Sequence, residues 1–266
     1  MSPTPARVGH FDAAGAARLD RAYATPQIVE QRKRLRAVVA ARPGEVGLDV
    51  GCGPGYLACE LAREVMPGGR IVAIDHSDDM LELARARVDR EMLGSRVEVR
   101  KGDAAALDFP DGTFDFVVGA QVYCFIDDVL HAIREAARVL RKGGRLVILD
   151  TDWDLCVWKS KDRLLMRRML DQRCSDYAHP HLPRELPGLF HAACLTLSGA
   201  DAYAIIETRY DPDFYGTDLI GSVRKAAIRQ GVTPEEAAAW ENDLRSRTGE
   251  GEYFFCVNRF IFSATK

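Results

Sequence analysis

Up to Asp150, apolar residues follow two different periods along the chain. Short apolar runs bounded by glycine, proline or charged residues are typical of buried strands. Between these runs, apolar residues recur every three or four positions, which predicts helices that pack one face on a sheet. The strands are expected at 46–50, 70–75, 97–100, 114–119 and 145–150, and the helices from Pro26 towards Pro43, at 56–65, from a Ser77 cap past Val88, and at 128–141 with Gly143 and Gly144 as its end.

Strands that alternate with helices of this length indicate βαβ units. They predict an α/β fold with a doubly wound parallel sheet and helices on both faces. No repeat or interdomain linker is visible, so residues 1–266 are expected to form one domain with a core at 27–150.

The pattern changes after Asp150. Helical insertions are expected at 151–190 and 211–250, where they would form a lid over a binding pocket. Their predicted parts are an aromatic and acidic segment at 151–160, a helix at 161–176, a segment rich in proline and histidine at 177–188, strands at 202–209 and 253–263, and two helical stretches between those strands, the second opened by a capping box at Thr233.

Composition narrows the class of protein. The 266 residues are 47% hydrophobic and 28% charged, as in a globular domain with a sizeable core. The net charge of -3 argues against a nucleic-acid-binding face. The 7 cysteines form no C-x-x-C pair, which favours reduced thiols and a cytoplasmic location. Met1–Asp20 has no apolar core of a signal peptide, and no membrane span is expected.

The turn after the first predicted strand contains Gly51, Gly53 and Gly55. A turn of this kind lets a ligand approach the backbone closely. The dinucleotide fingerprint would require a third glycine at Tyr56, and a phosphate-binding P-loop would require a G-K-[ST] sequence, so neither motif is present. Asp49, just before the first glycine, would repel a pyrophosphate but would suit an ammonium group.

Two more carboxylates follow the next two predicted strands. Asp75 closes the second strand, where its two oxygens can accept hydrogen bonds from ribose hydroxyls. Asp103 follows the third strand, where it can accept from an exocyclic amine such as that of adenine. A ligand with an ammonium, a ribose diol and an adenine but no phosphate has the chemistry of S-adenosylmethionine.

Residues 27–150 resemble the cofactor domain of the class I S-adenosylmethionine-dependent methyltransferases. The resemblance is closest to the ubiquinone/menaquinone-biosynthesis branch, methyltransferase type 11. It implies a Rossmann-like sheet of seven strands in the order 3-2-1-4-5-7-6 with the last strand antiparallel. The segments that carry it are LDVGCGPG (48–55), AIDHSDDMLELAR (73–85), GDAAALDFPDGTFDFVV (102–118) and RVLRKGGRLVI (138–148).

The resemblance also implies roles for single residues. Met80 would pack on the adenosine, the Ala104 backbone would bind adenine, and Gln121 would contact the methionine part. Tyr23 and Gln27 would fold over the cofactor, although a helix that only packs on the sheet edge is an equal alternative. The full set expected at S-adenosylmethionine is Tyr23, Asp49, Gly51, Cys52, Gly53, Gly55, Asp75, His76, Met80, Asp103, Ala104 and Gln121.

One position departs from the family pattern. Many relatives have a histidine just after the fourth strand, where this chain has Phe125. Contacts made by that histidine are therefore not expected here. Arsenite methyltransferases use clustered cysteines in a similar fold, but Cys124 and Cys156 show no such pairing.

Candidates for a general base follow the fifth predicted strand. Asp152 lies between aromatic residues in a segment expected to flank the acceptor, because ligands of open α/β sheets bind outside the carboxyl ends of strands. The alternative is that Trp153 and Trp158 only cover the edge of the core. His179 and His181 are further catalytic candidates. No metal is expected, since these histidines have no nearby acidic or cysteine partner in the sequence.

Methyl transfer from a sulfonium is an in-line displacement in which the protein mainly aligns the acceptor. The sequence predicts such an enzyme, with a small-molecule acceptor whose reacting atom can be oxygen, nitrogen or carbon. The alternatives are a lyase or cyclase of the same fold, an RNA or protein methyltransferase, and a nicotinamide dehydrogenase, which Tyr56 and Asp49 disfavour. No nucleic-acid partner is expected, and a homodimer is compatible with the sequence.

Overall fold

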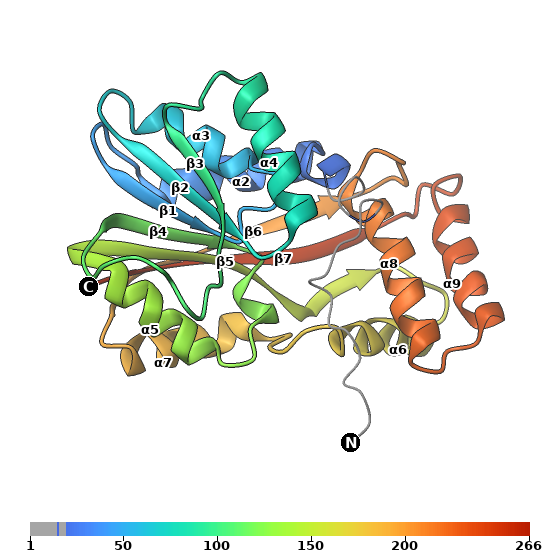
Figure 1. Ribbon diagram of the computed structural model, residues 1–266. Helices are drawn as coiled ribbons and strands as arrows, with labels where there is room; N and C mark the ends of the chain where they lie inside the picture. Colours follow the sequence, from blue (N-terminus) through green and yellow to red (C-terminus); the bar gives the residue numbers. More distant parts are fainter. Residues whose placement is uncertain (1–14, 16–19) are drawn as a thin grey trace.

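The computed structural model describes residue 15 and residues 20–266 (Figure 1). The expectation that Met1–Asp20 contains no signal peptide therefore falls almost entirely outside the described residues. Within the described part of the chain, no helix has both the length and the hydrophobicity needed to cross a bilayer. The elements are α2 (Pro26–Val39), β1 (Val46–Val50), α3 (Tyr56–Glu64), β2 (Arg70–Asp75), α4 (Asp78–Arg90), β3 (Val97–Lys101), β4 (Phe114–Ala120), the 3₁₀ turn η1 (Tyr123–Phe125), α5 (Val129–Val139), β5 (Leu140–Trp158), α6 (Arg163–Cys174), α7 (Leu182–Ala192), β6 (Thr196–Glu207), α8 (Tyr215–Arg229), α9 (Pro234–Ser246) and β7 (Phe255–Thr265).

The strands form one 7-stranded sheet of order β3-β2-β1-β4-β5-β7-β6. Strands β1 to β5 pair in parallel, whereas β7 is antiparallel to both β5 and β6. The predicted order and the antiparallel last strand are therefore confirmed. The chain reverses direction across the sheet between β1 and β4, and ligands of such sheets bind at the carboxyl ends of the strands at this point.

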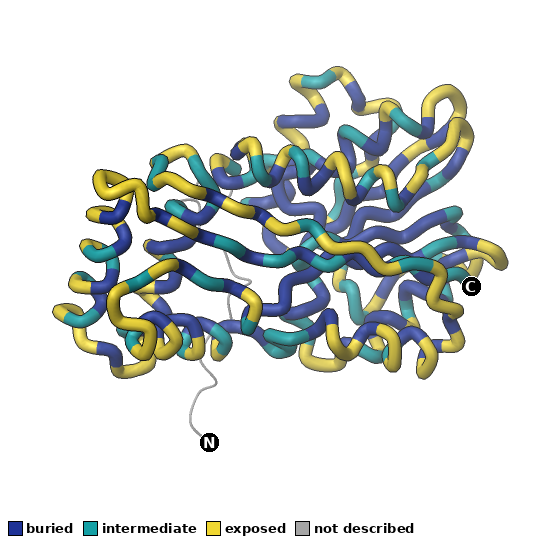
Figure 2. The backbone as a smooth tube through the Cα atoms, turned by 180° about the vertical axis from the view of Figure 1, so that it is seen from behind, coloured by how far each residue is buried: buried dark blue, intermediate teal, exposed yellow. Residues whose placement is uncertain are grey.

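Helices cover both faces of the sheet (Figure 1). Helices α2, α3 and α4 bury Leu35, Leu61 and Val88 against one face, and α5 and α7 bury Ile133 and Phe190 against the other. The edge strand β6 is exposed along much of its length, whereas the central strands are buried (Figure 2). This burial explains why the inner strands read as continuous apolar runs in the sequence.

Helices α6, α8 and α9 pack on one another beside the end of β5 (Figure 1). Trp158, the last residue of β5, lies with its ring centroid 5.6 Å from that of Trp240 in α9 and 4.6 Å from that of Phe255 in β7. All three side chains are fully buried. This aromatic cluster anchors the helices to the long strands and holds them over one side of the ligand edge.

Several boundaries differ from the sequence-based expectation, among them the start of β6, which lies at Thr196 and not at Ala202. Strand β5 does not end at Asp150 but continues to Trp158, with a register shift against β7 between Thr151 and Cys156. The aromatic and acidic segment is thus an irregular continuation of β5. Because of the irregularity, the sequence does not show the alternation of buried and exposed residues that is typical of a strand.

Gly143 and Gly144 do not end α5, which stops at Val139. They lie inside β5, where the N–H of Gly143 donates to the carbonyl of Lys266 at 2.9 Å. No helix or strand was expected in the segment rich in proline and histidine at 177–188. In the structure, α7 starts within it, at Leu182. Proline at its N-terminus is compatible with a helix because no intrahelical N–H bond is needed there.

The predicted helix caps differ in outcome. Thr233 forms the expected capping box with Glu236, and Ser77 accepts from the N–H of Met80 at 3.4 Å. Thr25 precedes α2 as expected but caps nothing, because its hydroxyl donates to the carbonyl of Ala22 at 2.8 Å.

Candidate functional site

A cavity of about 980 Å³ opens at the carboxyl ends of β1, β2 and β4. Its volume lies near the upper end of the range of small-ligand sites, which is roughly 300–1,000 Å³. The cavity is one continuous space with two differently built parts. We call one part the glycine half, lined by Gly51, Gly53, Asp75, Met80 and Asp103, and the other the arginine half, lined by Trp153, Arg173, Tyr177, Tyr215 and Arg259.

Most residues predicted to bind a cofactor line this cavity. Asp49, Cys52 and Gly55 are the exceptions, because they lie behind the glycine turn and not on its open side. The residues that do line it are Tyr23, Gly51, Gly53, Asp75, His76, Met80, Asp103, Ala104 and Gln121.

The three turn glycines have different structural roles. All three have positive φ, at 65° for Gly51, 52° for Gly53 and 79° for Gly55. A Cβ on Gly51 would lie 2.4 Å from Cγ2 of Val122, and a Cβ on Gly55 would lie 3.1 Å from Cα of Ala84. A Cβ on Gly53 would meet nothing closer than the Tyr23 hydroxyl at 4.0 Å. Gly53 therefore leaves space that a ligand can occupy, whereas the other two allow close packing.

Asp75 fixes the glycine turn and faces the cavity. Its Oδ2 accepts from the N–H of Gly53 and its Oδ1 from the N–H of Ser77, both at 2.9 Å. The side chain is 8% exposed. Each carboxylate oxygen can accept a second hydrogen bond, so the ribose hydroxyls predicted from the sequence are chemically suited to this position.

Asp49 is a buried carboxylate beneath the turn. Desolvation, followed by the charge of Asp75, raises its pKa to about 8, although the N–H of Ala58 donates to it. Its Oδ2 has no hydrogen-bond partner among the residues that the structure describes. Burying such an oxygen is costly. Because this oxygen has no accessible surface, a positively charged ligand group in the cavity would favour its ionised form only across the turn.

The outer wall of the glycine half is formed by α4 and by the turn after β3. Met80 is buried against the cavity, and Asp103 is exposed at its rim. Oδ1 of Asp103 accepts from the N–H of Ala105 at 2.8 Å, which holds the turn in shape. An apolar side chain beside an accepting carboxylate suits a flat, amine-bearing ring.

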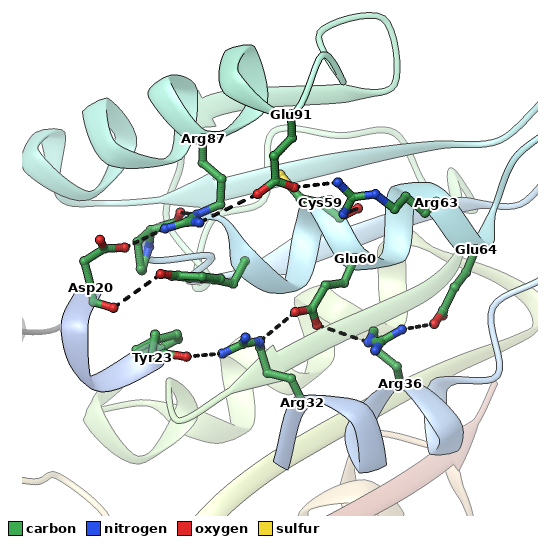
Figure 3. Close-up of polar contacts among 12 residues, drawn as sticks. Asp20, Tyr23, Arg32, Arg36, Cys59, Glu60, Arg63, Glu64, Arg87 and Glu91 are labelled. Atoms are coloured by element: carbon green, nitrogen blue, oxygen red, sulfur yellow. Dashed lines mark hydrogen bonds and ion pairs between the residues drawn. The ribbon is translucent and has the colours of Figure 1, made fainter. Parts of the chain in front are cut away.

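Two arginines hold the segment containing Tyr23 against the turn (Figure 3). Arg32 of α2 donates to the carbonyl of Tyr23 at 2.6 Å, and Arg87 of α4 pairs with Asp20 at 2.6 Å. Arg87 also donates to the carbonyl of Pro54, within the turn, at 2.8 Å. The Tyr23 side chain is thereby placed in the lining of the cavity, where burial and the charges of nearby aspartates raise its pKa.

Tyr56 takes part in the same network. The guanidinium carbons of Arg87 and Arg32 lie 3.2 Å and 4.6 Å from the centroid of its ring. The ring of Tyr23 stacks on it with centroids 6.2 Å apart. The residue that replaces the third dinucleotide glycine is thus part of the support for the turn.

Gln121 stands between the two halves. It has a positive φ of 60° directly after β4. Its Oε1 accepts from the hydroxyl of Thr151 at 2.8 Å and from Arg259 at 2.6 Å, and its Nε2 donates to Asp150 at 3.4 Å. Burial raises the pKa of Asp150 to about 6. A single amide therefore links the ends of β4, β5 and β7.

The arginine half combines cations with aromatic rings. Arg259 of β7 is 1% exposed and Arg173 of α6 is 8% exposed, and both line the cavity. The ring of Trp153 stacks on that of Tyr177 at 5.0 Å. Phe125, which replaces the family histidine, lies 4.9 Å from the same tyrosine ring and extends this aromatic wall.

The catalytic candidates lie elsewhere. The cavity lining includes Trp153 but not Asp152, His179 or His181. Asp152 is 2% exposed; its Oδ1 lies 3.0 Å from Nδ1 of His181, and its Oδ2 accepts from Arg184 at 2.5 Å. Neighbouring residues of a strand point to opposite faces, so the side of β5 that presents Trp153 to the cavity turns Asp152 away. Their catalytic role stays a prediction that this geometry does not favour.

Asp152, Asp154 and His181 each place one ligand atom within 4.8 Å of the others. The guanidinium of Arg184 already binds both carboxylates. A cation in the same place would compete with this permanent positive charge, so the cluster is accounted for as an ion-pair network.

The cysteines near the cavity are poor nucleophiles. Cys124 and Cys156 are fully buried, and burial raises the pKa of the first thiol well above its usual value and that of the second to about 12. The reactive form of cysteine is the thiolate. Chemistry based on these two thiols is therefore not supported.

Comparisons with known proteins identify relatives of the central part of the chain. Residues 48–148 match the family model described as a methyltransferase domain. An uncharacterized 37.1 kDa protein in transposon TN4556 of Streptomyces fradiae is 40% identical over 136 residues, which cover 51% of this chain and 39% of that protein. Demethylmenaquinone methyltransferase of Bacillus cereus is 33% identical over 120 residues, 45% of this chain and 50% of the relative. The chain thus spans half or less of the length of these curated relatives.

The fold also has solved counterparts. Phosphoethanolamine N-methyltransferase 2 of Haemonchus contortus, in complex with S-adenosyl-L-methionine, superposes with a TM-score of 0.61 at 18% identity. The match covers 96% of this chain and 57% of that one. At this level of identity the likeness concerns the fold alone.

Several residues of the site were not anticipated. Arg87 and Arg173 lie in predicted helices that contain many arginines, and nothing in the sequence separates them from surface residues. Arg259 carried a usable signal, because it is the one charged residue in the apolar strand Phe255–Thr265. A charge at the centre of a buried strand is rare without a function or a partner.

Proposed function

We propose that this chain, whose residues 48–148 form a class I S-adenosylmethionine-dependent methyltransferase domain, transfers a methyl group to a small-molecule acceptor. The observation that carries the proposal is the continuity of the cavity. The glycine half has carboxylates suited to an adenosyl sulfonium. It opens directly into the arginine half, which is lined by arginines and aromatic rings. A cofactor and an acceptor can therefore meet without crossing bulk water.

The residues present fit the cofactor. Asp49, buried beneath the turn and outside the cavity lining, would attract its ammonium only through the turn, whereas Asp75 would accept from its ribose hydroxyls and Met80 with Asp103 would hold its adenine. When bound, S-adenosylmethionine supplies a methyl group on a sulfonium, whose sulfur keeps the electron pair as a lone pair of the acceptor forms the new bond to carbon.

The chain itself contributes alignment and exclusion of water. Gln121 is fixed by three hydrogen bonds at the junction of the halves, and Tyr23 closes the space above Gly53. Holding the acceptor in line with the reacting carbon can account for a large part of a rate enhancement. A general base is needed only if the acceptor must lose a proton in the transition state.

A small acceptor is favoured over RNA or protein. The arginine half is lined by side chains such as Trp153, Tyr177 and Arg259 that are buried within the fold. The net charge of -3 adds no long-range attraction for nucleic acid.

The proposal is tested by calorimetry with S-adenosylmethionine and S-adenosylhomocysteine. We expect both to bind, and Asp75→Asn to weaken binding by about tenfold to a hundredfold, as for a lost hydrogen bond to a charged group. Asp78→Asn is the matched control, since Asp78 is exposed at the start of α4, is not part of the cavity lining, and pairs with Lys101. Absence of heat with both ligands, or equal affinity in Asp75→Asn, would refute the cofactor assignment. Transfer of radiolabelled methyl into a metabolite extract then distinguishes methyl transfer from lyase or cyclase chemistry.

A further inference from the structure

Two buried guanidinium groups in the arginine half have no role in binding the cofactor as proposed above. Arg259 projects from β7 and Arg173 from α6, and both line the cavity. An arginine removed from water costs several kcal/mol unless an anion or a full set of acceptors compensates for the lost hydration. The hydrogen-bond and ion-pair partners of these two side chains therefore show whether an anion compensates each charge.

Arg259 is satisfied only by neutral oxygens. Its Nη1 donates to Oε1 of Gln121 and to the hydroxyl of Thr151, and its Nε has no partner among the described residues. Burial raises the pKa of Asp150, and the charge of Arg259 opposes this only weakly. The oxygens of Asp150 accept from the N–H groups of Thr151 and Cys124 and not from Arg259. Because the Nε of Arg259 is closed to a ligand, the donor that Arg259 keeps for one is Nη2, which makes no hydrogen bond to the described residues.

Arg173 is only partly neutralised. Its Nη2 donates to the hydroxyl of Tyr177 at 2.7 Å, and Asp176 lies 3.7 Å from its Nη1. Asp176 pairs more closely with Arg229, at 2.6 Å. The Nε of Arg173 also has no partner within the described part of the chain.

Both cations contact one aromatic surface. The guanidinium carbon of Arg173 lies 4.8 Å from the centroid of the Trp153 ring, and that of Arg259 lies 6.0 Å from it. Tyr215 faces Arg259 at 4.9 Å from the other side of the cavity. The cavity lining also holds Lys225 and Arg229 and the carboxylates of Asp127, Asp128, Asp176 and Asp218, of which Asp176 pairs with Arg229. Arg173 and Arg259 themselves place positive charge beside flat rings.

We propose that the methyl acceptor is a planar organic acid, whose carboxylate is bound by Arg173 and Arg259 and whose ring lies against Trp153. This inference rests on the proposed methyl transfer. Guanidinium groups match carboxylates in geometry and form charge-assisted hydrogen bonds with them. The carboxylate would take the free donors of both arginines and supply the charge that neither protein partner provides.

The test uses matched pairs of acids and neutral amides on the full chain saturated with S-adenosylhomocysteine. The probes are 4-hydroxybenzoate with 4-hydroxybenzamide, indole-3-acetate with indole-3-acetamide, and hexanoate with hexanamide as the non-planar pair. By calorimetry, we expect each aromatic acid to bind at least about tenfold more tightly than its amide. Arg173→Gln and Arg259→Gln should each remove this preference. Arg224→Gln is the control, because Arg224 is on α8 but pairs with Glu241 away from the cavity lining.

The outcomes separate this inference from the proposed function. Affinity for S-adenosylhomocysteine is measured in every variant and should change less than about threefold. Acids that bind no better than amides, or no acid that binds while S-adenosylhomocysteine does, would overturn the acid acceptor and leave methyl transfer standing. Loss of S-adenosylhomocysteine binding in Arg259→Gln, with the acid preference retained, would assign Arg259 to the cofactor and likewise overturn the inference. Arg259→Lys, which keeps the charge, and near-ultraviolet circular dichroism identify a variant that has merely failed to fold.

Discussion

The two halves of the cavity are built by different parts of the chain and in different ways. The glycine half consists of backbone turns after β1, β2 and β3, and its charged groups include the carboxylates of Asp75 and Asp103, with Asp49 buried beneath the turn. The arginine half consists of side chains from β5, β7, α6 and α8, and its buried charges are Arg173 and Arg259. A cationic cofactor and an acidic acceptor would each meet the opposite charge. If both proposals hold, one cavity would combine a cofactor site built from backbone turns with an acceptor site built from side chains.

The largest expected effect tests whether the cofactor approaches the backbone at Gly53 in the glycine half. Gly53→Ala should weaken binding of S-adenosylhomocysteine by about thirtyfold, because the new methyl projects into space that the ligand needs, and overpacking costs about 1–3 kcal/mol. Gly143→Ala is the matched control, since Gly143 also has a positive φ, at 77°, but a Cβ there meets nothing within 4 Å. Both changes force alanine into the left-handed region and should lower the free energy of unfolding by about 1–2 kcal/mol.

Affinity from calorimetry and stability from urea unfolding are measured on both variants. If Gly53→Ala and Gly143→Ala lose affinity equally, backbone strain and not occupied space explains the loss. The proposal that the glycine half binds the cofactor through its backbone would then be rejected. If Gly53→Ala binds as the parent does, the cofactor does not approach the turn.

The second effect concerns the buried carboxylate of Asp49. Its pKa is raised to about 8, so in the free protein the group is mostly protonated at pH 6–7. A bound ammonium favours the carboxylate, so binding should release a proton and affinity should rise about tenfold between pH 6 and pH 7. The range stops there because the α-amino group of the ligand titrates near about 8. Calorimetry in buffers of different ionisation enthalpy measures the proton directly.

The raised pKa of Asp49 also makes the stability of the folded state depend on pH. A carboxyl group whose folded pKa exceeds its unfolded value favours the folded state most at low pH, and this contribution is lost as pH rises from about 4 to about 8. Asp49→Asn should therefore flatten both the pH dependence of binding and this part of the stability profile. A profile that keeps its slope in Asp49→Asn would assign the proton to another group, with Asp75 and Glu60 as the neighbouring carboxylates.

The glycine half could be predicted because its determinants are local. A turn of the type formed by Gly51 and Gly53 must follow a strand and precede a helix, and parallel strands bring the end of β2, with Asp75, to the same edge. Sequence spacing therefore carries three-dimensional information here. The strand order followed from the resemblance, and the handedness rule for βαβ units placed the helices on both faces.

The arginine half could not be predicted in the same way. Arg173 and Arg259 are brought together only by the packing of α6 against the sheet, and nothing in their spacing indicates contact with Trp153. The register shift in β5 had a further consequence. The sequence placed segment 151–160 beside the cavity but did not show which of its side chains face it. Side chains alternate between the two faces of a strand, so Asp152 was chosen as the candidate base although Trp153 is the residue that lines the cavity.

The smallest expected effect tests that point. His181→Gln should change kcat/KM for the acceptor by less than about twofold, because Nδ1 of His181 lies 3.0 Å from Asp152 outside the cavity lining. Loss of a true general base lowers the rate by about 10²–10⁴-fold. His191→Gln, at the exposed end of α7, controls for the loss of an imidazole from the same helical region. A hundredfold loss confined to His181→Gln would require the imidazole to turn into the arginine half during the reaction, and the division between the two halves would then have to include the ion-pair network around Arg184.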